Sequence, residues 1–165
     1  MARVYFTIGG NLGAREKNLE EARNLISARI GTVSKQSAIF ESEPWGFSSN
    51  DNFLGQVLLV ETSLTPAALM LEISYIESKL GREHQGIMYS SRTIDIDVLF
   101  YDQLVLFTPE LIVPHKHLHK RRFVLEPLNE IAPNFIHPLF SMTVHELLSS
   151  CPDECKVWRY QPVGA

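Results

Sequence analysis

The sequence predicts an α+β fold in which one antiparallel sheet carries helices. Three observations support this prediction. Four stretches have the β-branched or alternating pattern of strands, and two stretches between them have apolar residues at helical spacing. Glycine and proline stand at several of the boundaries. In chain order these elements read β-α-β-β-α-β, which is the split βαβ or ferredoxin-like arrangement.

The first part of the chain supplies a strand, a helix and a second strand. Val4 to Ile8 is β-branched and aromatic, and we expect the following Gly9-Gly10 to form a tight turn. Apolar residues from Leu19 to Ile30 recur at helical spacing, which predicts an amphipathic helix that stops at a glycine. Val33 to Glu41 is expected to be the second strand, and the turn residues of segment 42–52 predict a loop.

The middle of the chain supplies the third strand, the second helix and the fourth strand. Phe53 to Thr62 has a central apolar run and is expected to be a strand. Thr65-Pro66 has the pattern of an N-cap followed by proline at the first helical position. Apolar residues from Leu69 to Leu80 mark the helix, and Gly81 closes it. Thr93 to Tyr101 is then the fourth strand.

The remainder predicts a C-terminal extension made of a hairpin and short helices. Leu104 to Phe107 is expected to return antiparallel after a turn at Asp102-Gln103, and Val124–Ile131 and Val144–Leu148 have short helical patterns. We find no linker or internal repeat, so residues 1–165 are expected to form a single domain.

The composition limits the function. A net charge of -4 argues against nucleic-acid binding, which needs a basic surface. No apolar stretch approaches the roughly 20 residues of a membrane span, and the apolar run at the N-terminus is too short for a signal peptide. We therefore expect a cytoplasmic protein without membrane or nucleic-acid partners, in which Cys151 and Cys155 are ordinary reduced thiols.

Asp95 and Asp97 form the most informative pair. Alternate residues of a strand point to opposite faces, so the two carboxylates are expected on one face, about 6–7 Å apart. Neighbouring like charges repel, and a cation relieves that repulsion. Magnesium is typically held by one or two carboxylates and by substrate phosphates. The alternative is a solvated face with two incidental acids, and the spacing alone leaves both interpretations open. The residues expected to face the core are Ile94, Ile96, Val98 and Phe100.

A second group of polar residues follows the fourth strand. Three histidines alternate in a segment that is rich in lysine and arginine. The cations disfavour a zinc site, and a polyphosphate suits them better. A solvated basic loop remains the alternative. The residues are His115, Lys116, His117, His119, Lys120, Arg121 and Arg122.

Taken together, these residues resemble the 6-hydroxymethyl-7,8-dihydropterin pyrophosphokinase family, over residues 3 to about 160. The resemblance implies transfer of the terminal diphosphate of ATP to the hydroxymethyl oxygen of the dihydropterin, with release of AMP, in folate biosynthesis. It also implies two magnesium ions. The matching motifs are Gly9-x-Asn11-Leu12-Gly13, Arg92-Thr93-Ile94-Asp95-Ile96-Asp97, Pro114-His115 and Arg121-x-Phe123-Val124-Leu125-x-Pro127-Leu128.

The same resemblance implies a role for each site residue. Asp95 and Asp97 match the metal ligands, and Arg82 and Arg92 match arginines that stabilise the transferring group. The implied ATP-binding positions are Glu77, Tyr89, Val98, Ile112, His115, Lys116 and Arg121. The implied pterin-binding positions are Ser42, Glu43, Trp45, Phe53 and Phe123, of which the two phenylalanines sandwich the flat ring. We expect the two substrates as the only partners, and a monomer.

Gly55 departs from the family pattern, which commonly has an asparagine that hydrogen-bonds the pterin. Gln56 is expected to point to the opposite face, so a water, Asn52 or Glu43 must compensate. Asp-x-Asp also occurs in other enzymes. The alternative function is therefore another magnesium-dependent transferase that uses a nucleotide.

Overall fold

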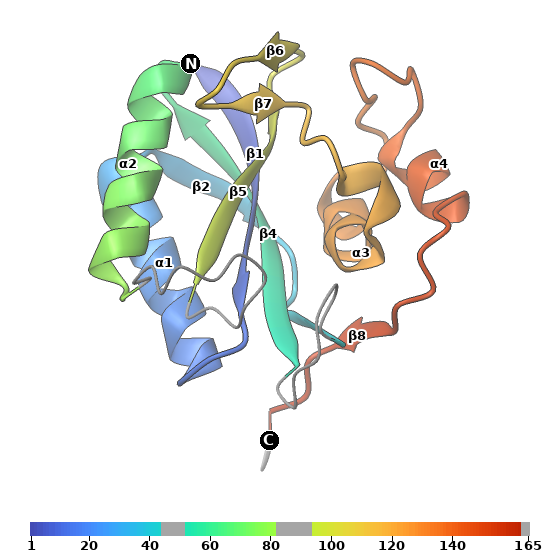
Figure 1. Ribbon diagram of the computed structural model, residues 1–165, viewed down its shortest axis with the longest axis horizontal. Helices are drawn as coiled ribbons and strands as arrows, with labels where there is room; N and C mark the ends of the chain where they lie inside the picture. Colours follow the sequence, from blue (N-terminus) through green and yellow to red (C-terminus); the bar gives the residue numbers. More distant parts are fainter. Residues whose placement is uncertain (44–51, 82–93, 163–165) are drawn as a thin grey trace.

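Figure 1 shows the computed structural model of the chain, a twisted sheet with helices on both faces. The structure describes residues 1–43, 52–81 and 94–162. In chain order the elements are β1 (Ala2–Gly10), α1 (Arg15–Arg29), β2 (Thr32–Gln36), β3 (Phe40–Ser42), β4 (Phe53–Thr62), α2 (Pro66–Lys79), β5 (Asp95–Tyr101), β6 (Leu106–Phe107), β7 (Ile112–Val113), a 3-10 turn (Leu118–Lys120), α3 (Arg122–Ile131), α4 (Val144–Ser149) and β8 (Val157–Arg159).

The strands of the main sheet follow the order β5-β1-β4-β3-β8, and β2 also pairs with β4. Each of these pairings is antiparallel. When β2 and β3 are counted as one interrupted strand, the elements from β1 to β5 follow β-α-β-β-α-β. The predicted ferredoxin-like core of an α+β fold is therefore confirmed. β8 adds a strand that the sequence did not predict.

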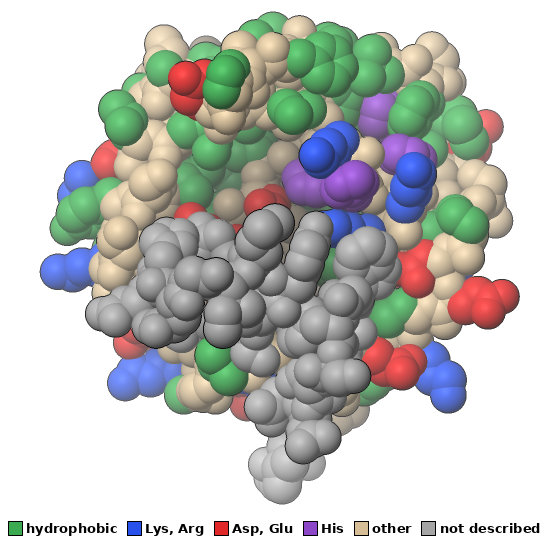
Figure 2. Space-filling view, viewed as in Figure 1, with side chains coloured by type: hydrophobic (Ala, Val, Ile, Leu, Met, Phe, Trp, Pro, Cys, Tyr) green, Lys and Arg blue, Asp and Glu red, His purple; other side chains and the backbone are tan. Residues whose placement is uncertain are grey.

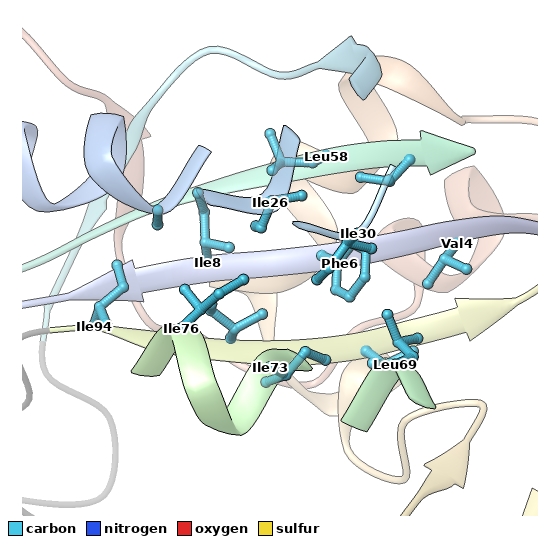
Figure 3. Close-up of a cluster of buried hydrophobic side chains, with 14 of the residues drawn as sticks. Val4, Phe6, Ile8, Ile26, Ile30, Leu58, Leu69, Ile73, Ile76 and Ile94 are labelled. Carbon is cyan, nitrogen blue, oxygen red and sulfur yellow. The ribbon is translucent and has the colours of Figure 1, made fainter. Parts of the chain in front are cut away.

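Helices α1 and α2 cover one face of the sheet (Figure 1). Figure 3 shows how their side chains meet those of the strands, with Ile26 of α1 and Ile73 of α2 on either side of Phe6 of β1. All three are at most 2% exposed. Burying one such side chain stabilises the fold by about 1.5–3 kcal/mol. This core therefore fixes both helices to the sheet and leaves the other sheet face to the remaining elements.

The limits of α2 follow the local signals. Thr65 is the N-cap, and its side chain accepts the N–H of Ala68 (3.2 Å), while Pro66 occupies the first turn. Gly81 follows the helix with φ of +83°, a conformation that glycine adopts without a Cβ penalty. Both predicted limits are confirmed.

Helices α3 and α4 lie on the opposite face (Figure 1). Leu125 and Leu128 of α3 and Leu147 of α4 are buried in a second core with residues of β1, β4 and β5. Thr143 and Glu146 form a capping box at the start of α4. The two short helical patterns are thus confirmed. Among the helices of the described residues, none is long and apolar enough to span a membrane.

The second strand is interrupted, so the prediction of one strand over Val33–Glu41 is wrong. β2 and β3 are separated at residues 37–39. There the N–H of Ala38 donates to Glu130 Oε1 of α3 (2.6 Å), so a side-chain acceptor replaces a sheet partner. Ser42, expected in a loop, is the last residue of β3.

The alternation of faces in β5 is interrupted by a bulge. Tyr5 of β1 pairs with Phe100, but the next residue, Phe6, pairs with Val98, so Leu99 is inserted without a partner. Phe100 therefore turns to the α3 side, where its ring meets that of Tyr5 edge-on (6.1 Å between centroids). The prediction that Phe100 would share the face of Val98 is wrong for this reason.

The chain after β5 does not return along β5 as predicted for Leu104–Phe107. β6 pairs instead with β7 in a separate two-stranded sheet. Asp102 adopts a positive φ of 49°, and its Oδ1 accepts the N–H of Arg3 (2.8 Å). This turn directs the segment away from the main sheet.

The buried side chain of His137 links stability to pH. Its Nδ1 accepts the N–H groups of Leu139 and Phe140 (3.1 and 3.2 Å), and its ring stacks on that of Phe140. Burial, with a smaller contribution from His119, lowers the pKa of His137 from 6.5 to about 4. The unfolded chain therefore binds more protons between these values. The stabilisation is complete above pH 6.5 and is lost as the pH falls toward 4.

We expect the free energy of unfolding to decrease by about 2 kcal/mol between pH 7.5 and pH 5 through this histidine. Urea unfolding at several pH values measures the effect. His137→Gln should make the profile less steep, with the contribution of His115 remaining because its pKa is also lowered to about 4, and His145→Gln, at an exposed position, should leave the profile unchanged. A His137→Gln profile as steep as that of the unmodified chain would contradict the assignment.

Candidate active site

Asp95 and Asp97 lie on the face of β5 that points away from α1 and α2. Asp95 pairs with Gly9 of β1, and Asp97 pairs with Thr7. Ile96, between them, is buried in the core beneath α1 and α2. Direct cross-strand partners share a face, so Asp95 lies beside Gly9, which has no side chain, and Asp97 lies beside the small side chain of Thr7. The predicted orientation of the two aspartates is confirmed.

His115 is bonded to the bulge of β5, and the charge of Asp95 acts on its ring. The N–H of His115 donates to the carbonyl oxygen of Leu99 (3.0 Å), and its Nδ1 accepts the N–H of His117 (3.2 Å). Burial, followed by the charge of Arg121, lowers the pKa of His115 to about 4. The ring is therefore neutral near pH 7. A neutral ring that accepts at Nδ1 carries its proton on Nε2, which makes Nε2–H a hydrogen-bond donor.

Glu77 of α2 supports the backbone between the two aspartates. Its Oε2 accepts the N–H of Ile96 (2.8 Å) in a buried contact. β5 is an edge strand, so this N–H has no strand partner, and the carboxylate supplies the missing acceptor. The sequence contained a signal for this contact. Glu77 follows Ile73 by four residues on the apolar stripe of α2, where a carboxylate is rarely buried without a partner.

The carboxyl groups of Asp95, Asp97 and Glu77 concentrate negative charge at one place. Burial raises the pKa of Asp97 to about 8; the charge of Asp95, a hydrogen bond to it and the charge of Glu77 add to the effect, and Arg121 opposes it. A bound divalent cation favours the ionised form and removes this repulsion. The donor set therefore fits a metal ion.

The number of ligands suits magnesium. Within the described ranges of the chain, no cluster of three or more His, Cys, Asp or Glu side chains is placed to hold a metal. Asp95 and Asp97 could supply two carboxylate ligands, with other positions taken by substrate oxygens and water. Magnesium is commonly bound in this way, whereas zinc requires more protein ligands.

Cationic and N–H donor groups lie beside the carboxyl groups. Arg121 is the N-cap residue of α3, and its charge acts on both Asp97 and His115. Lys116 is exposed. Burial and then the charges of Arg121 and Lys116 lower the pKa of His117. Figure 2 shows histidine side chains gathered with lysine and arginine on one face of the molecule, near acidic side chains. This combination suits a polyphosphate with its metal ion.

The predicted aromatic residues come to the same side of the sheet. Phe53 of β4 pairs with Ser42 of β3, and both face α3. Phe123 lies in the first turn of α3 and packs against the second core. The guanidinium carbon of Arg121 lies 5.9 Å from the centroid of the Phe123 ring. The carboxyl groups of Asp95 and Asp97, the cations and both phenylalanines therefore lie on one face of the sheet.

The surface above Gly55 is open. Among the described residues, a Cβ atom built at Gly55 would meet only the carbonyl oxygen of Ile8, at 3.6 Å. Gln56 points to the other face as predicted, and its Nε2 donates to the carbonyl oxygen of Ser37 (2.6 Å). Phe40 of β3 is the cross-strand partner of Gly55 and shares its face. The sequence analysis missed Phe40, because the register of β3 against β4 is a property of the folded sheet.

The other predicted site residues are placed as follows. Val98 is buried in the core beneath α1 and α2, so its side chain lies on the opposite face from Asp97. Ile112 is half-buried in β7, and Glu43 is exposed just after β3. The remaining candidates lie outside the described residues; they are Trp45, Arg82, Tyr89 and Arg92.

Comparison with known proteins identifies similar sequences. Residues 5–133 match the family described as 7,8-dihydro-6-hydroxymethylpterin-pyrophosphokinase (HPPK). The chain is 40% identical over 146 residues to the 2-amino-4-hydroxy-6-hydroxymethyldihydropteridine pyrophosphokinase of Aquifex aeolicus (strain VF5), covering 88% of this chain and 90% of that protein. It is 38% identical over 129 residues to the protein of the same name from Bacillus subtilis (strain 168), covering 78% and 77%.

Solved structures resemble the fold. The chain superposes on a Plasmodium falciparum HPPK-DHPS crystal structure with pterin and p-hydroxybenzoate at a TM-score of 0.75 and 17% identity. The match covers 90% of this chain and 42% of that chain, so this chain spans less than half of the two-part protein. At this identity the likeness supports the α+β fold alone.

Proposed function

The chain belongs to the 7,8-dihydro-6-hydroxymethylpterin pyrophosphokinase family, and from this premise we propose how its residues carry out the reaction. It is an ATP-dependent diphosphotransferase of folate biosynthesis: the terminal diphosphate of ATP passes to the hydroxymethyl group of the dihydropterin, and AMP is released. The observation that carries the residue assignment is the grouping of the buried Asp97 with Asp95 and Glu77, whose charges add to the effect of burial in raising the pKa of Asp97 to about 8.

Asp95 and Asp97 hold two magnesium ions together with ATP. The repulsion between the carboxyl groups supports this assignment, because cations offset it. Magnesium bound there supplies charge neutralisation at the phosphate oxygens. Glu77 acts beneath the pair, since its bond to the N–H of Ile96 fixes the backbone that carries both aspartates.

The basic side of the site binds the phosphates of ATP. His115 donates a hydrogen bond through Nε2–H, and Arg121 supplies a permanent positive charge beside Asp97. Arg82 and Arg92 stabilise the transferring group. The other ATP positions in this proposal are Glu77, Tyr89, Val98, Ile112 and Lys116, and Val98 takes part through its backbone because its side chain is in the core.

The pterin lies between the rings of Phe53 and Phe123. Aromatic stacking offers large contact area at a low cost in conformational entropy. The open surface above Gly55 leaves room for the ring to approach the backbone of β4. Ser42, Glu43 and Trp45 read the polar edge of the ring. Among described residues, no side chain stands out as a general base, so positioning of the hydroxymethyl group carries much of the rate.

We also propose that residues 1–165 form a single domain, and that the chain acts as a monomer in the cytoplasm. The main sheet supports the single domain, because it includes both β1 and β8 from opposite ends of the described chain.

An assay for AMP tests the proposed function. With ATP, magnesium and 6-hydroxymethyl-7,8-dihydropterin we expect AMP and the pterin diphosphate in equal amounts, and omission of any component should stop both. Chromatography of the products measures them. Formation of ADP in place of AMP, or AMP release without the pterin, would contradict the reaction.

A further inference from the structure

Glu43 is held by two residues near the C-terminus. Its N–H donates to the carbonyl oxygen of Lys156 (3.4 Å), and its Oε1 accepts the N–H of Lys156 (3.2 Å). The thiol of Cys155 donates to the carbonyl oxygen of Glu43 (3.6 Å). The N–H, the carbonyl and the carboxylate of Glu43 are thus each bonded to the segment 155–156.

The strand that follows this segment continues the same contact. β8 pairs with β3, and Val157 lies opposite Ser42. Farther along, Trp158 Nε1 donates to Glu41 Oε1 (3.1 Å). β3 has only three residues, and without β8 it would be the edge of the sheet. Short edge strands are weakly held, so the pairing with β8 does much to fix the positions of Ser42 and Glu43.

Contacts on both sides hold β8 itself in place. Arg159 bonds to Glu130 of α3 on one face of the sheet. On the other face, the hydroxyl of Tyr160 donates to Glu16 Oε1 of α1 (2.7 Å). β8 and the residue that follows it are therefore bonded to two helices. Because they are held in place, Glu43, which is bonded to the residues just before β8, is held in place as well.

We propose that the segment Cys155–Val157 positions Ser42 and Glu43 for the pterin, with Cys155 and Lys156 as positioning residues. This inference rests on the proposed function, in which Ser42 and Glu43 bind the pterin. The segment lies beyond residue 133, where the match to the family ends. The N–H of Lys156 holds one carboxylate oxygen of Glu43. Glu43 therefore serves the pterin from the position at which this segment fixes it.

The expected signature is a change in pterin affinity alone. The bonds to Glu43 come from Cys155 and Lys156, whereas Asp153 accepts the N–H groups of both Cys155 and Arg122, the neighbour of Arg121. Changes at Glu43 and Lys156 leave this second link in place, so ATP binding should be little affected. A loosened Glu43 must be ordered when the pterin binds, and that ordering lowers affinity. Loss of a single hydrogen bond of this type corresponds to about a three- to tenfold change.

Paired variants on both sides of the bond test the proposal. Glu43→Ala removes the acceptor, and Glu43→Gln keeps a carbonyl oxygen there. Lys156→Pro removes the donor N–H, and Lys156→Ala keeps it. We expect Glu43→Ala and Lys156→Pro each to raise the KM for the pterin about three- to tenfold. The KM for ATP should stay within about twofold. Lys156→Ala, which keeps the donor N–H, should resemble the unmodified chain, and Glu43→Gln should raise the KM for the pterin less than Glu43→Ala does.

The double variant Glu43→Ala/Lys156→Pro decides whether the two changes act through one bond. Its KM for the pterin should be no higher than that of the more affected single variant, because the same bond is already lost. Multiplying effects would mean that Glu43 contacts the pterin independently of the segment. A parallel rise of the KM for ATP would indicate general disruption. Either result overturns the proposal.

A second perturbation covers the case in which Lys156→Pro does not fold. Alkylating Cys151→Ser protein with iodoacetamide modifies Cys155 alone, and the bulky adduct should raise the KM for the pterin. Alkylated Cys155→Ser protein is the control. An unchanged KM after complete alkylation of Cys155 also overturns the proposal. Failure of the proposed function is a separate result, because the unmodified chain would then release no AMP.

Discussion

Asp97→Asn is expected to abolish diphosphate transfer and to raise the unfolding temperature of the magnesium-free protein. The pKa of Asp97 is raised to about 8, chiefly by burial and then by Asp95, so near pH 7 the fold works against ionisation of this group. The folded chain without metal therefore keeps this carboxyl protonated, and the free-energy cost of doing so begins above the usual aspartate pKa of 3.8 and grows up to pH 8. Asparagine is neutral in both the folded and the unfolded chain and keeps a similar shape, so it removes this cost. Each kcal/mol gained corresponds to about 2–4 °C at this chain length.

The loss of activity should be large. Metal ions supply several kcal/mol of charge stabilisation in transfer reactions, and each 1.36 kcal/mol is tenfold in rate, so we expect a loss of about 10²- to 10⁴-fold. Thermal unfolding with EDTA and AMP release with magnesium measure the two effects. Glu20→Gln, an exposed carboxylate on α1, is the control and should change neither. Full activity in Asp97→Asn, or a lower unfolding temperature, would refute this account.

Gly9→Ala is expected to cause a large loss of stability. A Cβ atom at Gly9 would lie 2.7 Å from the carbonyl oxygen of Leu54, which belongs to the paired backbone of β4 and cannot rotate away. Overpacking of this kind costs about 1–3 kcal/mol, and a rigid backbone places the variant at the upper end. Gly9 also pairs with Asp95, so separation of β1 from β4 should disturb the metal site.

Gly55→Ala is the matched comparison, because Gly55 is the cross-strand partner of Gly9. Within the part of the chain that the structure describes, its Cβ would meet only the carbonyl oxygen of Ile8 at 3.6 Å, an ordinary contact. We expect its stability to stay within about 0.5 kcal/mol of the unmodified chain. Urea unfolding compares the two variants. Equal stabilities for Gly9→Ala and Gly55→Ala would show that the close approach of the backbones has no energetic effect.

The sequence predicted the parts of the fold that depend on neighbours in the chain. The start of α2 at Thr65-Pro66 and its end at Gly81 follow from local capping chemistry. The prediction that the two aspartates of β5 lie on one face is correct because no bulge lies between them. Family resemblance then supplied roles that spacing alone left open.

The parts that were wrong or missed depend on distant residues. Leu99 forms a bulge through its pairing with β1, and this moves Phe100 to the other core. The break between β2 and β3 involves Glu130, 92 residues after Ala38. The contact of Glu77 with the backbone of β5 and the pairing of β8 with β3 likewise need the assembled sheet. Sequence patterns report local preference, and these contacts are not local.

The most direct test of the central claim, that Asp95 and Asp97 bind ATP through magnesium, is the affinity for ATP with and without magnesium. Isothermal titration should show much tighter ATP binding with magnesium than with EDTA for the unmodified chain. In the Asp95→Asn/Asp97→Asn variant the two affinities should be equal, because the protein ligands of the metal are gone. A double variant that keeps the full magnesium-dependent gain would contradict the account.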